Sequence, residues 1–343
     1  MRGLNWLLSF LLFCTSLSVE AQKAARNARD FFAEDSIIQF TITTDIRNLL
    51  AEKKSLKDID ASVSFKFPDS SEIQETIKLR PRGHSRKEHC YLSSLMLLFN
   101  SNPSNKLAFL KNLKMVAPCG KSSSDEQYLL KEYLTYKIYN LLTDLSFRVR
   151  LLRVTFNDIR KNVNSFSQYA FLLEDIDAVA KRNSHRQKKG IRYSPAGLQS
   201  SQSTLMCIYQ YMIGNTDWSI PNYHNVKLVV PREDTNSLPL PVPYDFDMTG
   251  LVNPPYAGTS AILGIEKVTD RLYRGFPVTT REVETVVALF LQKEKEIIGS
   301  IYSFNLLNRK SKHEMATFLY GFFSEIKNKG SVKANFITNA RRQ

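Results

Sequence analysis

The sequence predicts an α+β fold with two lobes, a sheet-rich N-terminal lobe over residues 22–175 and a mainly helical C-terminal lobe over residues 176–343. Apolar and polar residues alternate along much of the first lobe, which is the pattern of half-buried strands. One helical segment interrupts these strands. After residue 200 the apolar spacing becomes that of helices, with two short strands between them.

The expected strands are marked by apolar residues two positions apart. Ile38, Phe40 and Ile42 form one such set, and Val63 and Phe65 belong to the next. Because side chains of a strand alternate between its two faces, each set predicts one buried face. Strands are expected near residues 38–42, 61–67, 77–80, 94–99, 149–156 and 169–173.

One helix is expected within the N-terminal lobe. It begins at "SSSDEQ", where a serine followed three residues later by an acid or amide makes a capping box. Its apolar face carries Leu130, Leu134, Ile138 and Leu141. In the C-terminal lobe, helices are expected over 204–213, 280–303 and 310–328, and strands over 226–230 and 242–246.

The first 21 residues have the layout of a secretory signal peptide. Arg2 precedes an apolar stretch from Leu4 to Phe13, and Ala21 provides a small residue at the expected cleavage point. A lipid attached to Cys14 is the alternative form of export. No later segment offers about 18 uninterrupted apolar residues, so we expect an exported protein, periplasmic, at the cell surface or secreted, without a membrane span.

The composition is that of an ordinary folded protein with a large basic surplus. Hydrophobic residues make up 43% and charged residues 23% of the 343 residues, and the net charge is +14. Such a surplus favours anionic partners, among them phosphates and acidic polysaccharides. Nucleic acid is not expected as a partner, because the chain is predicted to be exported and carries neither a zinc-finger spacing nor an aromatic-rich RNA-binding signature.

Three cysteines lie beyond the signal segment. Oxidising conditions outside the cytoplasm would allow Cys90 and Cys119 to form a disulfide. Cys207 lies in the apolar run "TLMCIYQYMIG", where a small buried core residue is expected. No cysteine pattern typical of structural zinc is present.

Acidic and amide side chains are concentrated in two stretches, "GNTDWSIPNYHN" at 214–225 and "VPYDFDMTG" at 242–250. The first lies between an expected helix and strand, and the second ends the next strand, so a hairpin would bring both to one edge. Oxygen ligands of this kind suit Mg²⁺, which binds through one or two carboxylates and substrate phosphates. Phosphoryl transfer needs an acid near the attacking hydroxyl and an Asn and an Asp on the metal.

Several short motifs resemble those of one known family. In order along residues 75–275 they are "KLRPRGHSRKEHC", "LLKEYLTYKIYN", "YAFLLED", "MIGNTDW", "HNVKL" and "VPYDFDMTGLV". Their order resembles CotH-like proteins, a family named for a spore-coat protein, and particularly its exported Bacteroidota branch. The resemblance implies a divergent two-lobed protein-kinase-like fold. It also implies the activity of an atypical kinase acting on secreted proteins.

The resemblance assigns roles to the acidic stretches, with ATP and Mg²⁺ or Mn²⁺ as cofactors. It implies that Asp217 is the catalytic acid/base that orients the acceptor hydroxyl. It implies metal binding by Asn225 and Asp245, with Asp247 as a second candidate. Seven residues separate Asp217 from Asn225, more than in the common kinase catalytic loop, so an insertion containing Pro221 must fold back.

The nucleotide-binding residues are assigned in the same way. Glu132 would form an ion pair with the cation that binds the phosphates, and Glu174 would lie beside the adenine. A lysine is missing from the family's usual position after "RG". Lys114 or Lys78 is expected to replace it, with Arg82 as a further candidate.

The expected function is that of an exported kinase that transfers phosphate from Mg- or Mn-ATP to a hydroxyl of a secreted protein or glycan. A second possibility is a catalytically silent surface or periplasmic module with the same fold, which binds a partner through its basic face. A third is a metal-dependent hydrolase built on Asp217, His224 and Asp245. Metal hydrolases usually draw on more nitrogen ligands than this single histidine.

Overall fold

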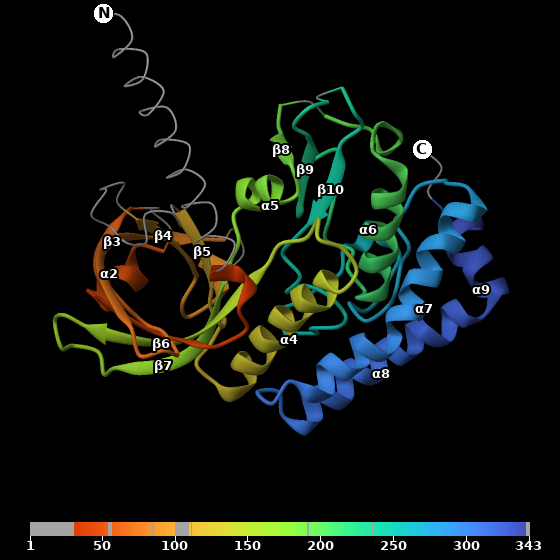
Figure 1. The fold of residues 1–343 in the computed structure, drawn as a ribbon. Helices are drawn as coiled ribbons and strands as arrows, with labels where there is room; N and C mark the ends of the chain where they lie inside the picture. Colours follow the sequence, from red (N-terminus) through yellow and green to blue (C-terminus); the bar gives the residue numbers. More distant parts are fainter. Residues whose placement is uncertain are drawn as a thin grey trace, which may run out of the picture.

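The computed structural model describes residues 31–53, 57–83, 86–99, 110, 112–190, 192–234 and 236–340. The predicted signal peptide lies outside these residues. A β-barrel forms one side of the molecule and a group of helices the other, as Figure 1 shows.

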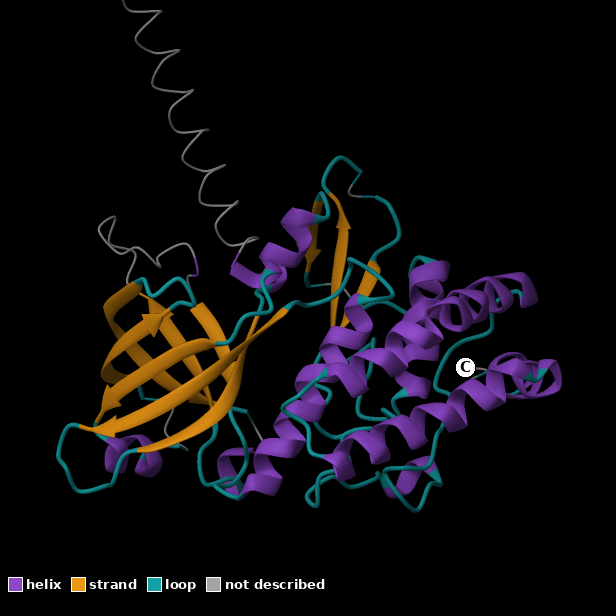
Figure 2. Ribbon diagram, turned by 60° about the horizontal axis from the view of Figure 1, so that its bottom comes forward, coloured by secondary structure: helices purple, strands orange, loops and turns teal. Residues whose placement is uncertain are grey.

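Seven of the described strands close into a barrel (Figures 1 and 2). Around the barrel they follow the order β1, β2, β3, β4, β5, β7 and β6. Every neighbouring pair is antiparallel except β1 and β6, which run parallel and close the ring. The strands are β1 (Ile38–Thr44), β2 (Ile59–Lys66), β3 (Glu72–Arg82), β4 (Ser94–Phe99), β5 (Asn112–Val116), β6 (Val149–Asp158) and β7 (Phe166–Leu173).

Alternate residues of every strand fill the barrel interior. Phe40 and Phe65 lie opposite each other on β1 and β2, with ring centroids 4.3 Å apart, and both are buried. Leu97 of β4 and Leu152 of β6 belong to the same apolar cluster. The period-two pattern of the sequence therefore predicts six of the seven barrel strands and their buried faces.

The two-lobed protein-kinase-like fold implied by the family resemblance is wrong for this chain, although the α+β class holds. Alternation in the sequence specifies one buried face for each strand, but it does not specify whether the sheet is open or closed. Closure depends on the register of β1 with β6, in which Ile38 pairs with Leu152. It also requires β5, which the sequence pattern does not predict.

Helices build most of the remaining structure, as the purple ribbons of Figure 2 show. They are α2 (Ile46–Ala51), α3 (Arg86–His89), α4 (Ser123–Asn140), α5 (Ile176–Arg182), α6 (Ser200–Met212), α7 (Thr280–Ser303), α8 (Arg309–Lys327) and α9 (Lys329–Lys333). A small antiparallel sheet has the order β10, β9, β8, with β8 (His185–Lys188), β9 (Val226–Pro231) and β10 (Leu240–Pro243). Within the described ranges no helix is both long and apolar enough to span a bilayer.

Helix α4 joins the barrel to the other helices. The expected capping box at its start is confirmed, since Ser122 and Asp125 bond reciprocally. Tyr133 packs against Phe171 of the barrel at 6.0 Å and against Phe304, which follows α7, at 5.7 Å between centroids. Outward-facing residues of β6 and β7 therefore belong to the same apolar core as α4, α6, α7 and α8.

The expected hairpin is confirmed by the pairing of β9 with β10. Val226 at the start of β9 lies opposite Pro243 at the end of β10. The backbone N–H of Tyr244 donates to the Asn225 carbonyl at 3.0 Å, which extends this contact beyond the strands. The stretches 214–225 and 244–250 therefore meet at one edge of the small sheet.

Cys90 and Cys119 form a disulfide, with their Cα atoms 4.4 Å apart. The backbone N–H of Tyr91 donates to the Cys119 carbonyl at 2.7 Å, so the two segments also share a main-chain bond. Cys207 is free and buried in the main apolar core, as its sequence environment predicts. The disulfide fixes helix α3 beside the segment that leads into α4.

Replacing Cys90 and Cys119 together by Ala should lower the free energy of unfolding by about 3 to 4 kcal/mol, because a cross-link over 29 positions restricts the unfolded chain. Urea denaturation of the variant and of the wild-type protein measures this difference. Wild-type protein treated with a reductant should unfold like the variant. Equal stability of the oxidised protein and the variant would show that the disulfide contributes nothing.

Candidate functional site

The acidic stretch 214–225 is attached to the end of helix α6. Asn215 donates through Nδ2 to Gln210 Oε1 at 2.9 Å, and its Oδ1 accepts the backbone N–H of Asp217 at 2.9 Å. Gly214 has a φ of 64°, and a β-carbon there would lie 3.3 Å from the Cα of Gly250. A side chain at position 214 would thus be strained, and it would separate the two stretches that form the site.

The insertion between Asp217 and Asn225 folds back on itself. Ser219 and His224 exchange two backbone hydrogen bonds of 2.9 Å each, which close a turn containing Pro221. The fold-back brings Asn225 against Asp217, where its Nδ2 donates to the Asp217 carbonyl at 2.7 Å and to Oδ2 at 3.1 Å. The structure thus joins the two residues that the sequence predicts to act together.

His224 also contacts Asp217. Its Nε2 lies 2.8 Å from Asp217 Oδ1, and both side chains are about half exposed, at 53% and 44%. Both carboxylate oxygens of Asp217 therefore accept a hydrogen bond. Among the described residues, none donates to Asn225 Oδ1, so this amide oxygen is available to a ligand.

Asp245 projects from a strained backbone position two residues after the end of β10. Its φ is 66°, in the left-handed region that Asp tolerates better than most residues. Its backbone N–H donates to the Tyr136 hydroxyl of α4 at 2.7 Å. Although solvent reaches the side chain, crowding by protein atoms raises its pKa to about 6, and repulsion from Asp247 adds to this.

Arg86 connects the acidic stretch to the barrel and to α4. Its Nε and Nη2 donate to Asp247 Oδ2 at 3.2 and 3.0 Å, and Nη2 also reaches Glu132 Oε2 at 3.0 Å. Nη1 donates to the Ala117 carbonyl at 2.8 Å. The three side chains are largely buried, with 12% of Arg86, 12% of Asp247 and 1% of Glu132 exposed.

The partner of Glu132 is therefore Arg86, a residue that sequence reasoning missed. It lies in the same "PRGHSRK" segment as Arg82, and nothing in the spacing of the two arginines separates their roles. Burial lowers the pKa of Arg86, but Asp247, Tyr256 and Glu132 outweigh this effect and raise it well above its ordinary value. Arg86 thus remains charged.

The carboxylates around Arg86 outnumber it. Burial raises the pKa of Glu132 well above its ordinary value, and Asp247 and Asp245 raise it further while Arg86 opposes the shift. Glu132 Oε1 is buried without a hydrogen-bond partner among the described residues. Ionisation of these neighbouring carboxylates is therefore unfavourable, and a cation at the solvent-accessible end of the cluster, where Asp245 lies, would favour it.

Three basic side chains gather beside Asp245, and we call Arg82, Lys114 and Lys227 the basic group. The Nζ atoms of Lys114 and Lys227 lie 5.4 and 5.2 Å from the centroid of the Tyr244 ring. Burial lowers the pKa of Lys114 to about 8, and Arg82 and Lys227 lower it further. No ion pair with a described acid engages any of the three, so their charges are available to an anion.

Two of the predicted phosphate-binding cations, Lys114 and Arg82, thus lie at the site. The third candidate, Lys78, lies on the barrel surface, where it forms an exposed ion pair with Asp60 at 3.0 Å. Lys227 was missed by sequence reasoning. It occupies a half-buried position in the apolar run of β9, and a lone lysine in such a run is the signal that could have found it.

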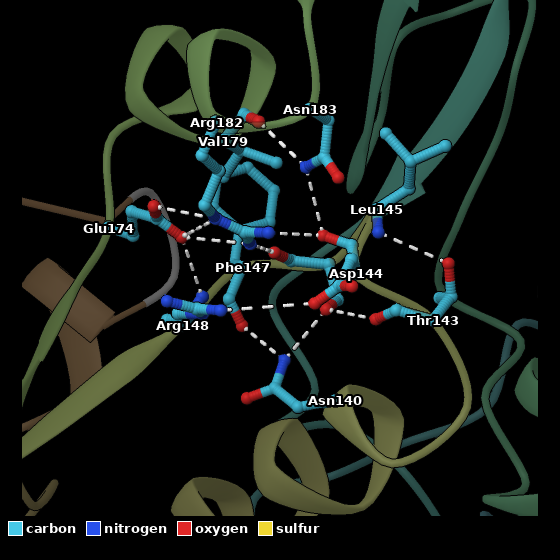
Figure 3. Close-up of polar contacts among 11 residues, drawn as sticks. Asn140, Thr143, Asp144, Leu145, Phe147, Arg148, Glu174, Val179, Arg182 and Asn183 are labelled. Atoms are coloured by element: carbon cyan, nitrogen blue, oxygen red, sulfur yellow. Dashed lines mark hydrogen bonds and ion pairs between the residues drawn. The ribbon is translucent and has the colours of Figure 1, made fainter. Parts of the chain in front are cut away.

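Glu174 has a different environment from the adenine contact expected for it. Its carboxylate accepts Arg182 Nε at 3.0 Å and the backbone N–H of Arg148 at 3.0 Å, and it is buried. Arg182 also donates to the carbonyls of Asp144 and Ser146. Figure 3 shows that this network fastens the end of β7 and helix α5 to the loop that follows α4.

The oxygen ligands at the site fit a cation that relies on substrate for part of its coordination. Within the described residues, no three His, Cys, Asp or Glu side chains are gathered into a metal-binding group. Mg²⁺ commonly needs only one or two carboxylates, because phosphates and water complete its shell. Asp245 and the Asn225 amide oxygen meet this requirement, whereas Asp247 is held by Arg86 and by Tyr256 at 3.4 Å.

Comparison with protein-family models and with curated proteins finds no match to this chain. The resemblance to CotH-like proteins therefore stays a prediction from short motifs. What can be inferred about function rests on the side chains of the site and their geometry.

Replacing Arg86 by Met should lower the free energy of unfolding by about 3 to 5 kcal/mol, because two buried carboxylates lose their partner. The matched control is Arg80→Met, which removes an exposed ion pair with Asp58 and should cost far less, because solvent screens such a pair. Chemical denaturation of both variants provides the test. Equal losses of unfolding free energy in the two variants would show that the buried ion pairs of Arg86 stabilise the fold no more than an exposed pair does.

Asp245→Asn should be more stable than the wild-type protein at neutral pH in metal-free buffer. The folded-state pKa of Asp245 is raised from 3.8 to about 6, so its ionisation opposes folding. This penalty is absent below about pH 4, where the acid is protonated in both states, and it is complete above about pH 6. Melting temperatures across this range should therefore diverge as pH rises. A constant difference would contradict the raised pKa.

Proposed function

We propose that the two acidic stretches and the basic group form a site for ATP and Mg²⁺ or Mn²⁺ that transfers a phosphoryl group to a hydroxyl. The observation that carries this proposal is the gathering of Asp217, Asn225 and Asp245 beside three cations without acidic partners among the described residues. We propose that the protein is exported and that the acceptor belongs to a secreted protein or glycan.

The basic group is suited to the phosphates of the nucleotide. Arg82 of β3 offers a planar guanidinium with several donors, and Lys114 of β5 and Lys227 of β9 offer compact charges. Burial keeps the two ammonium groups incompletely hydrated, as their lowered pKa values indicate. A polyphosphate would replace the missing hydration with direct charge-assisted hydrogen bonds.

Asp245 and the Asn225 amide oxygen would hold the metal ion. A bound Mg²⁺ or Mn²⁺ would neutralise the charge that develops on the transferred phosphate. Arg86 keeps Asp247 in place behind Asp245, so the acid that faces solvent has a fixed backbone.

Asp217 would accept the proton of the acceptor hydroxyl. The acceptor oxygen forms the new bond to phosphorus, the bond between the γ-phosphorus and its bridging oxygen breaks, and ADP leaves with that electron pair. His224 and Asn225 orient the carboxylate through its two oxygens. Its half-exposed position leaves room for an acceptor on a large molecule.

A catalytically silent binding module is the second candidate, and two contacts favour it. Both oxygens of Asp217 already accept hydrogen bonds, which weakens its action as a base. Glu132 is paired with Arg86 rather than with a member of the basic group. In this case the basic group would bind an anionic partner without transfer.

The test is thermal unfolding of the full chain with and without Mg- or Mn-ATP, combined with incorporation of labelled γ-phosphate into secreted acceptors. A ligand at about 100 times its dissociation constant stabilises the folded state by about 2.7 kcal/mol, so the wild-type protein should melt at a clearly higher temperature. Asp245→Asn and Lys114→Met should each abolish the shift. Each shift is measured against the variant's own ligand-free baseline.

Asp60→Asn and Lys78→Met are the matched controls, because they alter an exposed ion pair on the barrel and should keep the shift. A shift without phosphate incorporation would favour the silent module. No shift with either metal and ATP would overturn the proposed nucleotide site.

A further inference from the structure

A cavity lies along helix α6, on residues that the acidic stretches do not use. It has a volume of about 450 Å³ and is bounded by the start of α6 and by the segment 273–278. Small-molecule sites in proteins commonly have volumes of about 300 to 1,000 Å³. The cavity is thus large enough for a ligand of that kind.

Small polar side chains on one face of α6 line this cavity. Ser200, Ser203, Thr204 and Cys207 follow the spacing that places residues on one side of a helix. Ser203 and Thr204 are 8% and 2% exposed, and their hydroxyls have no hydrogen-bond partner among the described residues. A buried hydroxyl without a partner is unfavourable, so a ligand group that reached these hydroxyls from the cavity would gain hydrogen bonds.

Tyr273 supplies a third hydroxyl from the opposite wall. It is 6% exposed, and its oxygen likewise has no partner within the described part of the chain. Its ring packs against Phe336 at 5.0 Å and Tyr211 at 6.2 Å between centroids. A β-carbon on Gly275 would lie 2.1 Å from the hydroxyl oxygen, so a larger residue at position 275 would displace the Tyr273 side chain.

The lining of the cavity carries no formal charge. Its apolar walls include Leu198, Phe276 and Val278. Burial raises the pKa of the Cys207 thiol to about 12, so the thiol is neutral at physiological pH. The hydroxyl of the lining residue Ser200 donates to the carboxylate of Glu282. Glu282 itself is not part of the lining. An ionic ligand would lose its hydration here without gaining a countercharge.

We propose that this cavity binds a neutral, mainly apolar small molecule whose hydrogen-bonding group meets Ser203, Thr204 and Tyr273. Three hydroxyls without partners among the described residues belong to the lining of an otherwise apolar pocket, and a few polar groups among apolar walls are the usual composition of a small-molecule site. Water alone would provide hydrogen-bond partners for the hydroxyls, but the apolar side chains of the walls would stay in contact with water, which is unfavourable. Occupation by water only is therefore the competing outcome of the test.

The probe is N-phenyl-1-naphthylamine, a neutral aromatic amine whose fluorescence increases in apolar surroundings. It is titrated into the full chain, and we expect saturable binding with a dissociation constant on the order of 10 μM. Ala196→Trp places a large ring at the exposed edge of the cavity and should weaken binding by about tenfold or more. Thr204→Val, which removes one hydroxyl and keeps the shape, should weaken binding about threefold.

Ser194→Trp is the matched control, because Ser194 is exposed and close in sequence but does not line the cavity. It should bind the probe like the wild-type protein, as should Asp245→Asn, whose change lies at the acidic site. Melting temperatures of all variants check that they are folded. Failure of the proposed ATP site would leave these results unchanged.

Three results would overturn the proposal. Absence of a saturable signal would mean that the cavity holds water only. Equal binding by the wild-type protein and Ala196→Trp would place the probe elsewhere. Equally tight, Ala196→Trp-sensitive binding of the anionic probe 8-anilinonaphthalene-1-sulfonate would contradict the preference for neutral ligands.

Discussion

The guanidinium of Arg86 is the contact on which the acidic site depends. It joins three segments that are distant in sequence, namely α3, Glu132 of α4 and Asp247 after β10. A buried ion pair persists only if its members are well bonded, and here the Ala117 carbonyl is the third partner of the guanidinium. The Cys90–Cys119 disulfide lies close to this contact in the sequence, because Cys90 follows α3 and Cys119 is two residues after Ala117. It therefore holds α3 to the segment that contains Ala117.

Once Arg86 fixes Asp247, the three residues of the "DFD" sequence take separate roles. Asp247 points into the buried bridge, and Phe246 packs into the main core against Tyr136 at 4.6 Å and Tyr209 at 5.7 Å. Asp245 is left facing solvent with a left-handed backbone. Burial and the neighbouring Asp247 raise the pKa of Asp245, so a cation bound beside this carboxylate would stabilise its ionised form.

The predictable parts of the structure are those set by short-range pattern. Period-two and helical spacing predict most strands and helices, and the β9–β10 hairpin follows from two strands separated by a short connection. Barrel closure depends on pairing between β1 and β6, far apart in sequence, and has no local signature. The choice of Arg86 over Arg82 as the partner of Glu132 likewise depends on the three-dimensional path of the chain.

The acidic site and the neutral cavity share two structural supports. Helix α6 lines the cavity with its first turns, while Gln210 near its end holds Asn215 and thereby the backbone of Asp217. Arg274, next to Tyr273, donates to the carbonyls of Thr216 and Trp218 on either side of Asp217. Since packed elements move as units, a change in the segment 273–278 would reach the acidic stretch through direct hydrogen bonds. The position of Asp217 is thus set by the same two elements that form the walls of the cavity.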